Sequence, residues 1–134
     1  MSTAFVAPLL RQPAARCTLR NIRNGQSLAD QICCAFDSRS RRIGLLRRDR
    51  FDSGEAMIIA PTTAVHTFGM RFPIDIAVVT RDGRIVKSRS IVPPSRIVAA
   101  LRGFAVIELP AGTLRRHDTV DGDRLVIEST RQAF

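Results

Sequence analysis

The sequence contains no tryptophan and no tyrosine, and seven phenylalanines are its only aromatic residues of the Phe, Trp and Tyr class. Stacking surfaces for sugars or bases are therefore scarce. The three cysteines are odd in number and form no C-x-x-C pair, a pattern typical of a reducing compartment rather than of a disulfide framework. No apolar run approaches the roughly 18 residues that a transmembrane helix requires. These absences predict a soluble, cytoplasmic protein without a transmembrane segment.

What is present is an ordinary globular composition in a short chain. The 134 residues are 45% apolar and 25% charged, and single domains commonly contain about 100–150 residues. We therefore expect a monomer with one globular domain over residues 17–130. Residues 1–16 carry no acidic side chain, and Pro8 interrupts their apolar stretch. They are predicted to form a flexible tail rather than a secretory signal.

The charge of the chain is strongly unbalanced. Basic residues number 21 and acidic residues 12, so the formal net charge is +9. Such an excess can attract nucleic acid or an acidic protein. Because no aromatic side chains interleave with the arginines, a solvated surface is the favoured interpretation, and a nucleic acid or acidic partner is the alternative. The densest patch comprises Arg39, Arg41, Arg42, Arg47, Arg48 and Arg50.

Short apolar segments separated by turn signals predict a protein that is mainly β. The expected strands cover residues 56–60, 74–79, 84–92, 104–109 and 124–128. Their spacing of roughly ten residues is typical of a compact antiparallel sheet or a small barrel. The predicted fold is therefore mainly β (α+β), a single compact antiparallel sheet or small barrel with a short helix near residues 39–46.

Two local features refine this expectation. Asn24-Gly25 is a strong hairpin signal, because both residues tolerate positive φ, and a hairpin centred there pairs Leu19 with Asp30. Ser38 or Ser40 can cap a helix that runs from residue 41 to residue 46. Gly44 then lies inside that helix, where it costs about 1 kcal/mol relative to alanine.

The most unusual segment runs from His66 to Asp75. If it is extended, alternate side chains share a face. Asp75 follows within an apolar strand, where an unpaired carboxylate is costly. In one interpretation it pairs with Arg71 or with backbone amides and locks a corner between two strands. In the other, the segment forms a polar pocket for a small anionic ligand, because an arginine fork suits a carboxylate or phosphate. The candidate ligand-binding residues are His66, Thr67, Met70, Arg71 and Asp75.

Other chemistry finds weaker support. A small enzyme that uses His66 or His117 as a general base is an alternative to a binding module. The sequence contains no phosphate-binding glycine loop, nucleophile elbow or paired carboxylate motif. No spacing of histidine and cysteine favours a metal site, and no cofactor is expected. A non-enzymatic binding module for a small anionic ligand is therefore the leading functional prediction.

Several segments, taken in order, resemble a known family. They are Arg41-x-x-Gly44-Leu45-Leu46, the run from His66 to Asp75, Asp82-Gly83, Glu108-Leu109-Pro110-Ala111-Gly112 and Gly122-Asp123. This series resembles the bacterial and archaeal proteins of domain of unknown function family 192, over roughly residues 17–129. In most of that family the central run reads more like Trp-Met-Lys-Asn-Thr before Pro-x-Asp, so this chain is similar to a His-Thr-Phe-Gly-Met-Arg variant. The resemblance implies a small β-rich fold with a short helix, and it implies no activity.

Overall fold

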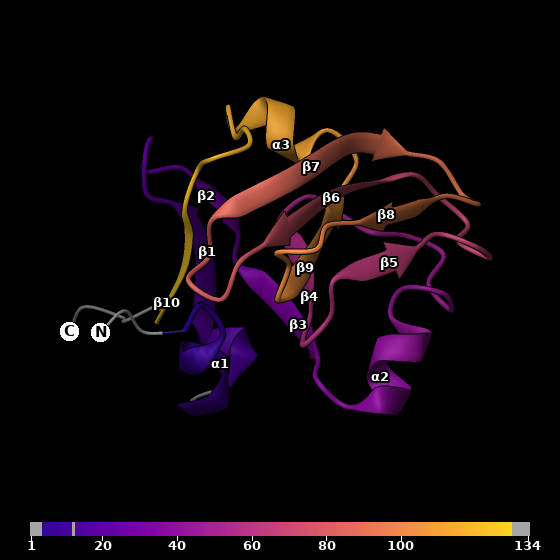
Figure 1. Ribbon diagram of the computed structural model, residues 1–134, viewed down its shortest axis with the longest axis horizontal. Coiled ribbons are helices and arrows are strands. Elements are labelled where there is room, and N and C mark those ends of the chain that lie inside the picture. Colours follow the sequence, from indigo (N-terminus) through magenta and orange to yellow (C-terminus); the bar gives the residue numbers. More distant parts are fainter. Residues whose placement is uncertain (1–3, 12, 130–134) are drawn as a thin grey trace.

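The structure, a computed structural model, describes residues 4–11 and 13–129 and contains a central mixed sheet of five strands. Its strand order is β3-β4-β9-β6-β7 (Figure 1). β3 and β4 pair in parallel, and the remaining neighbours pair antiparallel. The strands are β3 (Gln31–Ala35), β4 (Glu55–Ile59), β9 (Ala105–Pro110), β6 (Ile74–Val79) and β7 (Ile85–Val92).

Two smaller sheets and several short helices surround the central sheet. One sheet has the order β10-β1-β2, and the other pairs β5 with β8. None of the helices in the described part of the chain is long and apolar enough to span a bilayer. These elements are α1 (Ala7–Arg11), a 3-10 helix (Ala14–Arg16), β1 (Cys17–Asn21), β2 (Ser27–Ala29), α2 (Ser38–Ile43), β5 (Ala64–His66), β8 (Ile97–Ala99), α3 (Thr113–Arg116) and β10 (Leu125–Ser129).

The mainly β character is confirmed, whereas the expectation of a single antiparallel sheet or a small barrel is wrong. The described residues form three sheets, none of which closes into a barrel. The reason lies in the connection between β3 and β4, which contains α2. Because parallel neighbours need a crossover connection of about a dozen residues or more, this segment allows β3 to join β4 in parallel instead of extending the sheet of β1.

The predicted hairpin forms, but with another register. The amide of Asn21 donates to the carbonyl of Gln26 (2.9 Å), and Leu19 lies opposite Ala29 rather than Asp30. The turn is centred between Arg23 and Asn24, one residue earlier than predicted, so that Arg20 lies opposite Ser27. The strands expected from the apolar segments all occur, with ends that differ by at most two residues.

The helix near residues 39–46 also forms, but it begins and ends earlier than predicted. Asp37, not a serine, is its N-cap, and its carboxylate accepts a hydrogen bond from the amide of Ser40 (2.8 Å). Gly44 has a φ of 44° and follows the last helical residue. The glycine therefore ends the helix instead of lying inside it, since only glycine adopts such a backbone conformation readily.

Part of the segment that precedes residue 17 packs against the rest of the described structure. Phe5, Val6 and Leu9 are buried and belong to a hydrophobic cluster together with β1 and β10 side chains. The amide of Phe5 donates to the carbonyl of Arg81 (2.7 Å). Residues 1–3 and 12 of the expected tail lie outside the described residues.

β6 and β9 are buried along their whole length, because both faces of the central sheet are covered. One face packs against α1, β1 and β10. The other face packs against Leu45, Met70 and Val98, which come from the segments around α2, β5 and β8. Ile76 lies opposite Glu108 in the register, and Asp75 lies opposite Leu109. Because opposite residues of antiparallel strands share a face, the two buried acids point to opposite sides of the sheet.

Candidate functional site

Asp75 is fully buried and is held by the backbone. Its carboxylate accepts hydrogen bonds from the amides of Ile91 (2.8 Å), Gly112 (3.0 Å) and Leu114 (2.9 Å). These bonds tie β6 to β7 and to the beginning of α3. These contacts match the interpretation in which Asp75 pairs with backbone amides and locks a corner between two strands. They also hold Ile91 at a φ of 52°, a conformation that is rare for a β-branched residue.

Arg71 does not reach Asp75. It is exposed and forms an ion pair with Asp49, which is exposed as well. Thr67 is buried, and its hydroxyl donates to the carbonyl of Pro93 (2.8 Å) and accepts from the amide of Arg96 (2.9 Å). In the structure Thr67 therefore anchors the turn after β7, while Arg71 lies on the surface.

The expected alternation of faces from residue 66 to residue 70 is wrong. β5 ends at His66, and Gly69 adopts a φ of 78°, so the segment turns instead of continuing as a strand. Met70 is consequently buried, whereas Phe68 is 48% exposed and its ring stacks against the imidazole of His66 with centroids 5.3 Å apart.

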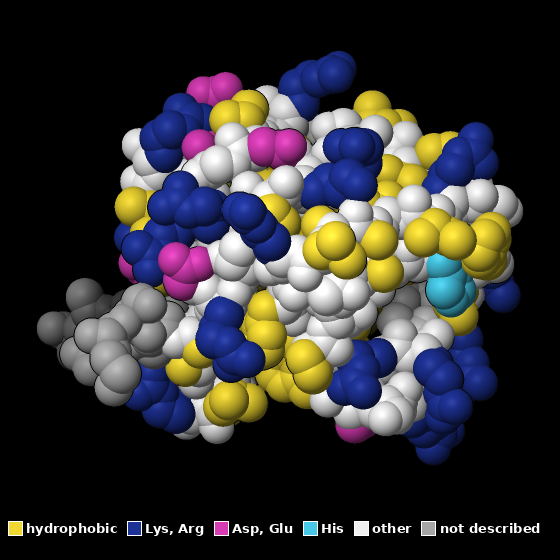
Figure 2. All heavy atoms as spheres, in the orientation of Figure 1, with side chains coloured by type: hydrophobic (Ala, Val, Ile, Leu, Met, Phe, Trp, Pro, Cys, Tyr) yellow, Lys and Arg dark blue, Asp and Glu magenta, His cyan; other side chains and the backbone are white. Residues whose placement is uncertain are grey.

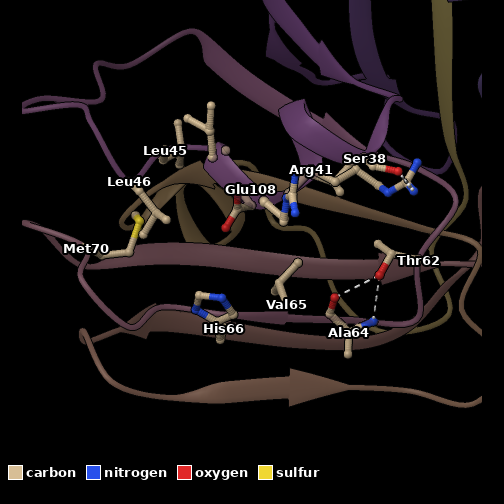
Figure 3. Close-up of a pocket in the computed structure, with 14 residues that line it drawn as sticks. Ser38, Arg41, Leu45, Leu46, Thr62, Ala64, Val65, His66, Met70 and Glu108 are labelled. Atoms are coloured by element: carbon tan, nitrogen blue, oxygen red, sulfur yellow. Dashed lines mark hydrogen bonds between the residues drawn. The ribbon is translucent and has the colours of Figure 1, made fainter.

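The structure does bring two of the predicted residues to a cavity. His66 and Met70 line a pocket between α2 and β5 that has a volume of about 350 Å³ (Figure 3). This volume lies within the range of about 300–1,000 Å³ that is usual for small-molecule sites. Apolar side chains supply most of the wall, among them Leu45, Leu46, Ile59, Val65 and Met70.

Glu108 lies at the buried end of this pocket. Its residue is only 3% exposed, and burial raises the pKa of its carboxyl to about 7. No described residue donates a hydrogen bond to this carboxyl or forms an ion pair with it. Its oxygens still reach the open space of the pocket, because no fully enclosed side-chain oxygen or nitrogen of the described residues lacks a partner. In Figure 3 the Glu108 side chain points into the space between α2 and β5, toward His66 and Val65. A carboxyl in this position can hold or exchange a proton, or receive a donor from a bound molecule.

Two arginines of α2 also belong to the pocket, the half-buried Arg41 and the exposed Arg42. The guanidinium of Arg41 donates to the carbonyl of Phe36 (2.8 Å), whereas Arg42 is exposed and has no polar partner among the described residues. Arg42 is therefore free to receive an anionic group.

The six-arginine patch is partly neutralised by its own surroundings. Arg48 pairs with Glu55 (3.0 Å) and Arg50 with Asp52 (2.9 Å). Like that of Arg42, the guanidinium groups of Arg39 and Arg47 make no hydrogen bond or ion pair with any described residue. Figure 2 shows basic side chains gathered around the position of α2.

His117 lies away from the pocket, at the end of α3. Its Nδ1 is 2.9 Å from the Oε1 atom of Gln26. Within the described residues, no group of three histidine, cysteine or acidic side chains is placed to hold a metal ion.

Sequence reasoning singled out Asp75 and missed Glu108 as a candidate. The signal was nevertheless present, because Glu108 is the only charged residue in the apolar segment 104–109. An acid in such a strand is costly unless it finds a partner or keeps its proton, which is the argument that drew attention to Asp75.

The comparisons with known proteins agree with this fold. The crystal structure of a protein from Sinorhizobium meliloti 1021, described as a "putative transcription regulator", matches with a TM-score of 0.70 and 25% identity, over 81% of this chain and 89% of that chain. A protein of unknown function from Novosphingobium aromaticivorans DSM 12444 matches with a TM-score of 0.71 and 22% identity, over 81% of each chain. No relative is found among curated proteins. A family model described as "Uncharacterized ACR" matches residues 20–127, and the chain therefore belongs to the DUF192 family.

Proposed function

We propose that this protein binds a small anionic molecule in the pocket between α2 and β5, where Arg42 receives the anionic group. The observation that carries the proposal is the position of Arg42, whose exposed and unpaired guanidinium lines a pocket of about 350 Å³. Guanidinium groups match carboxylates and phosphates with two parallel hydrogen bonds. His66 and Met70 contribute to the same pocket.

In this proposal the cation that contacts the ligand is Arg42, and not Arg71 as predicted from the sequence. Arg71 already has an acidic partner, Asp49, and it does not line the pocket. Asp75 has three backbone donors, so its carboxylate is satisfied without a ligand. In this proposal Thr67 and Asp75 support the pocket through the turns that they anchor.

Thermal unfolding in the presence of small carboxylates and phosphorylated metabolites tests the proposal. A ligand present at 100 times its Kd adds about 2.7 kcal/mol of stability. We expect Arg42→Gln to abolish the shift. Arg39→Gln is the matched control, because Arg39 is an exposed, unpaired arginine of the same helix that does not line the pocket. Arg71→Ala should also keep the shift. A shift that depends on Arg71 and not on Arg42, or no shift with any of these anions, would refute the proposal.

A second candidate function is binding of nucleic acid or of an acidic protein through the basic patch. It is favoured by the three arginines without partners, Arg39, Arg42 and Arg47, and by the description of the Sinorhizobium protein. Duplex binding through three arginines predicts a log–log salt slope of about −3, because each phosphate contacted contributes about −0.9. Binding to duplex DNA that is insensitive to salt, or absent at low salt, would exclude this function for nucleic acid.

A further inference from the structure

We infer that the ligand of this pocket is a small zwitterion, with a cationic nitrogen at Glu108, an anionic group at Arg42 and an apolar chain between them. This inference rests on the proposed function, since it uses the same pocket and the same anion position. It adds the chemical class of the ligand. The first support comes from the contrast between the two buried acids of the central sheet.

The fold satisfies one of these acids completely and leaves the other without a partner. Asp75 receives three backbone hydrogen bonds. Glu108, on the opposite face, receives none from the described residues, although it is 3% exposed. A buried carboxylate without a donor is strongly disfavoured. A cationic nitrogen brought by a ligand would supply both the donor and the opposite charge.

No cationic side chain of the described residues forms an ion pair with Glu108. β4 and β6 flank it in the sheet, and the residues opposite it there are Met57 and Ile76, both apolar. The titratable groups that share the pocket with Glu108 are Arg41 and Arg42 from α2 and His66 from β5. Arg42 and His66 are exposed and Arg41 is partly exposed.

The space beside the carboxyl is kept open by a glycine. A Cβ atom at Gly44 would lie 3.8 Å from Oε1 of Glu108 and 4.0 Å from Cδ1 of Ile59. Because Gly44 ends α2 at a positive φ, the helix terminus approaches the carboxyl without a side chain in between. The apolar walls then suit a hydrocarbon chain that connects a buried cation to an exposed anion.

A ligand of this kind should change the protonation of the pocket. Burial holds the pKa of Glu108 at about 7, so that about half of the carboxyl groups are protonated at neutral pH. A bound ammonium group stabilises the carboxylate, and binding at pH 7 therefore releases about half a proton. Affinity for a zwitterion should rise about tenfold from pH 6 to pH 8, because the neutral acid must first lose its proton below its pKa.

Four small molecules of similar size separate the contribution of the ammonium group to binding from that of the carboxylate. They are 6-aminohexanoate, its isomer L-leucine, and hexanoate and hexylamine, which each lack one of the two charged groups. Isothermal titration calorimetry in buffers with different ionisation enthalpies measures both affinity and proton release. We expect 6-aminohexanoate to bind at least tenfold more tightly than each of the other three.

Glu108→Gln is the decisive variant. It should reduce the affinity for 6-aminohexanoate at least tenfold and abolish its pH dependence, while hexanoate binds as tightly as before. Retained hexanoate binding shows that the pocket of the variant is intact. Glu128→Gln is the matched control, since Glu128 lies on β10 outside the pocket and pairs with Arg20. It should leave all four affinities unchanged.

The outcomes separate this inference from the proposed function. If hexanoate binds at least as tightly as 6-aminohexanoate, and Arg42→Gln abolishes its binding, the anion site stands and the zwitterion is refuted. If L-leucine binds as tightly as 6-aminohexanoate, the separated charges are refuted. If hexanoate and 6-aminohexanoate both fail to bind at millimolar concentration, the inference is overturned.

Discussion

The buried carboxyl of Glu108 should make the stability of the protein depend on pH in a defined direction. Its pKa rises from an ordinary value of 4.5 to about 7 because burial disfavours the charged form. The folded protein therefore binds this proton more tightly than the unfolded chain does. The resulting stability is fully present below about pH 4.5, declines as the pH rises, and is lost once the pH passes about 7. Glu108→Gln carries no titrating proton and should lack this decline.

The size of the effect follows from the shift in pKa. Each pKa unit corresponds to about 1.36 kcal/mol, so a shift from 4.5 to about 7 is worth about 3 kcal/mol over the whole titration. Between pH 5 and pH 8 the expected part of this loss is about 2.5 kcal/mol. Domains of this size commonly have unfolding free energies of about 5–15 kcal/mol, so the difference is a large fraction of the total.

Urea unfolding at a series of pH values from 5 to 8 measures this difference directly. The free energy of unfolding of the wild-type protein is subtracted from that of Glu108→Gln at each pH, which cancels every titrating group that the two proteins share. The difference should rise by about 2.5 kcal/mol in favour of the variant. For Glu128→Gln the difference should stay constant, because hydrogen bonding to Arg20 lowers the pKa of Glu128 and its titration lies below this range. Parallel curves for the wild type and Glu108→Gln would show that the carboxyl is solvated or paired, and would refute the reasoning.

Three further predictions concern other polar groups of the fold. Asp75→Ala leaves three buried amides without an acceptor and should lower the free energy of unfolding in urea by at least about 3 kcal/mol. Asp49→Ala at the surface should change it by less than about 0.5 kcal/mol, and an equally small loss for Asp75→Ala would contradict the corner lock. A hydrogen bond from Arg23 lowers the pKa of Asp123 to about 2, so Asp123→Asn should lower the free energy of unfolding by about 1–2 kcal/mol at neutral pH. The variant should also lose less stability than the wild type between about pH 4 and pH 2, and identical acid unfolding of the two proteins would contradict this prediction. Iodoacetamide at pH 8 followed by mass spectrometry should label exposed Cys33 first, and buried Cys17 only after unfolding; early labelling of Cys17 would show that β1 opens readily.

Much of the strand content could be predicted from the sequence, because short apolar segments bounded by turns have few other structures available. β6 runs from Ile74 to Val79, as its apolar run indicates. The pairing of strands was less predictable. β3 carries the buried residues Ile32 and Ala35, but their pattern does not reveal whether the strand pairs with β1 or with β4. That choice depends on the segment around α2, whose length allows a parallel crossover.

The helix shows how a local signal can be correct in type and wrong in position. Ser38 and Ser40 are good N-cap residues by type, and the sequence-based assignment placed Gly44 within the helix. Asp37 is an equally good cap one residue earlier, and a glycine is more common after a helix than inside one. Both facts favour the observed helix from Ser38 to Ile43. The position of this helix matters for function, since it places Arg42 at the pocket.

The candidate site could be predicted only in part, and the two buried acids show why. An acid in an apolar strand predicts that a partner is needed, but it does not tell where the partner comes from. Asp75 lies beside an irregularity in the pairing of β6 with β7, and close to the first turn of α3, where backbone amides are free to donate. Glu108 lies in the middle of β9, between two regular strands whose amides are used in the ladders.

This difference in available backbone donors is the physical basis for assigning the two acids different roles. Near a strand irregularity and the start of a helix, backbone amides would otherwise lack acceptors, and a carboxylate can accept their hydrogen bonds. The buried carboxylate of Asp75 therefore satisfies amides that the fold itself leaves without partners. In a regular central strand no such amides exist. The carboxyl of Glu108 must then be satisfied by a proton, by water that enters the pocket, by a side chain across the pocket or by a bound molecule. No described side chain takes that position, and the proton is held with a pKa of about 7. A carboxyl that exchanges its proton so easily at neutral pH beside an open cavity is placed to bind a cation, and for that reason Glu108 rather than Asp75 marks the site.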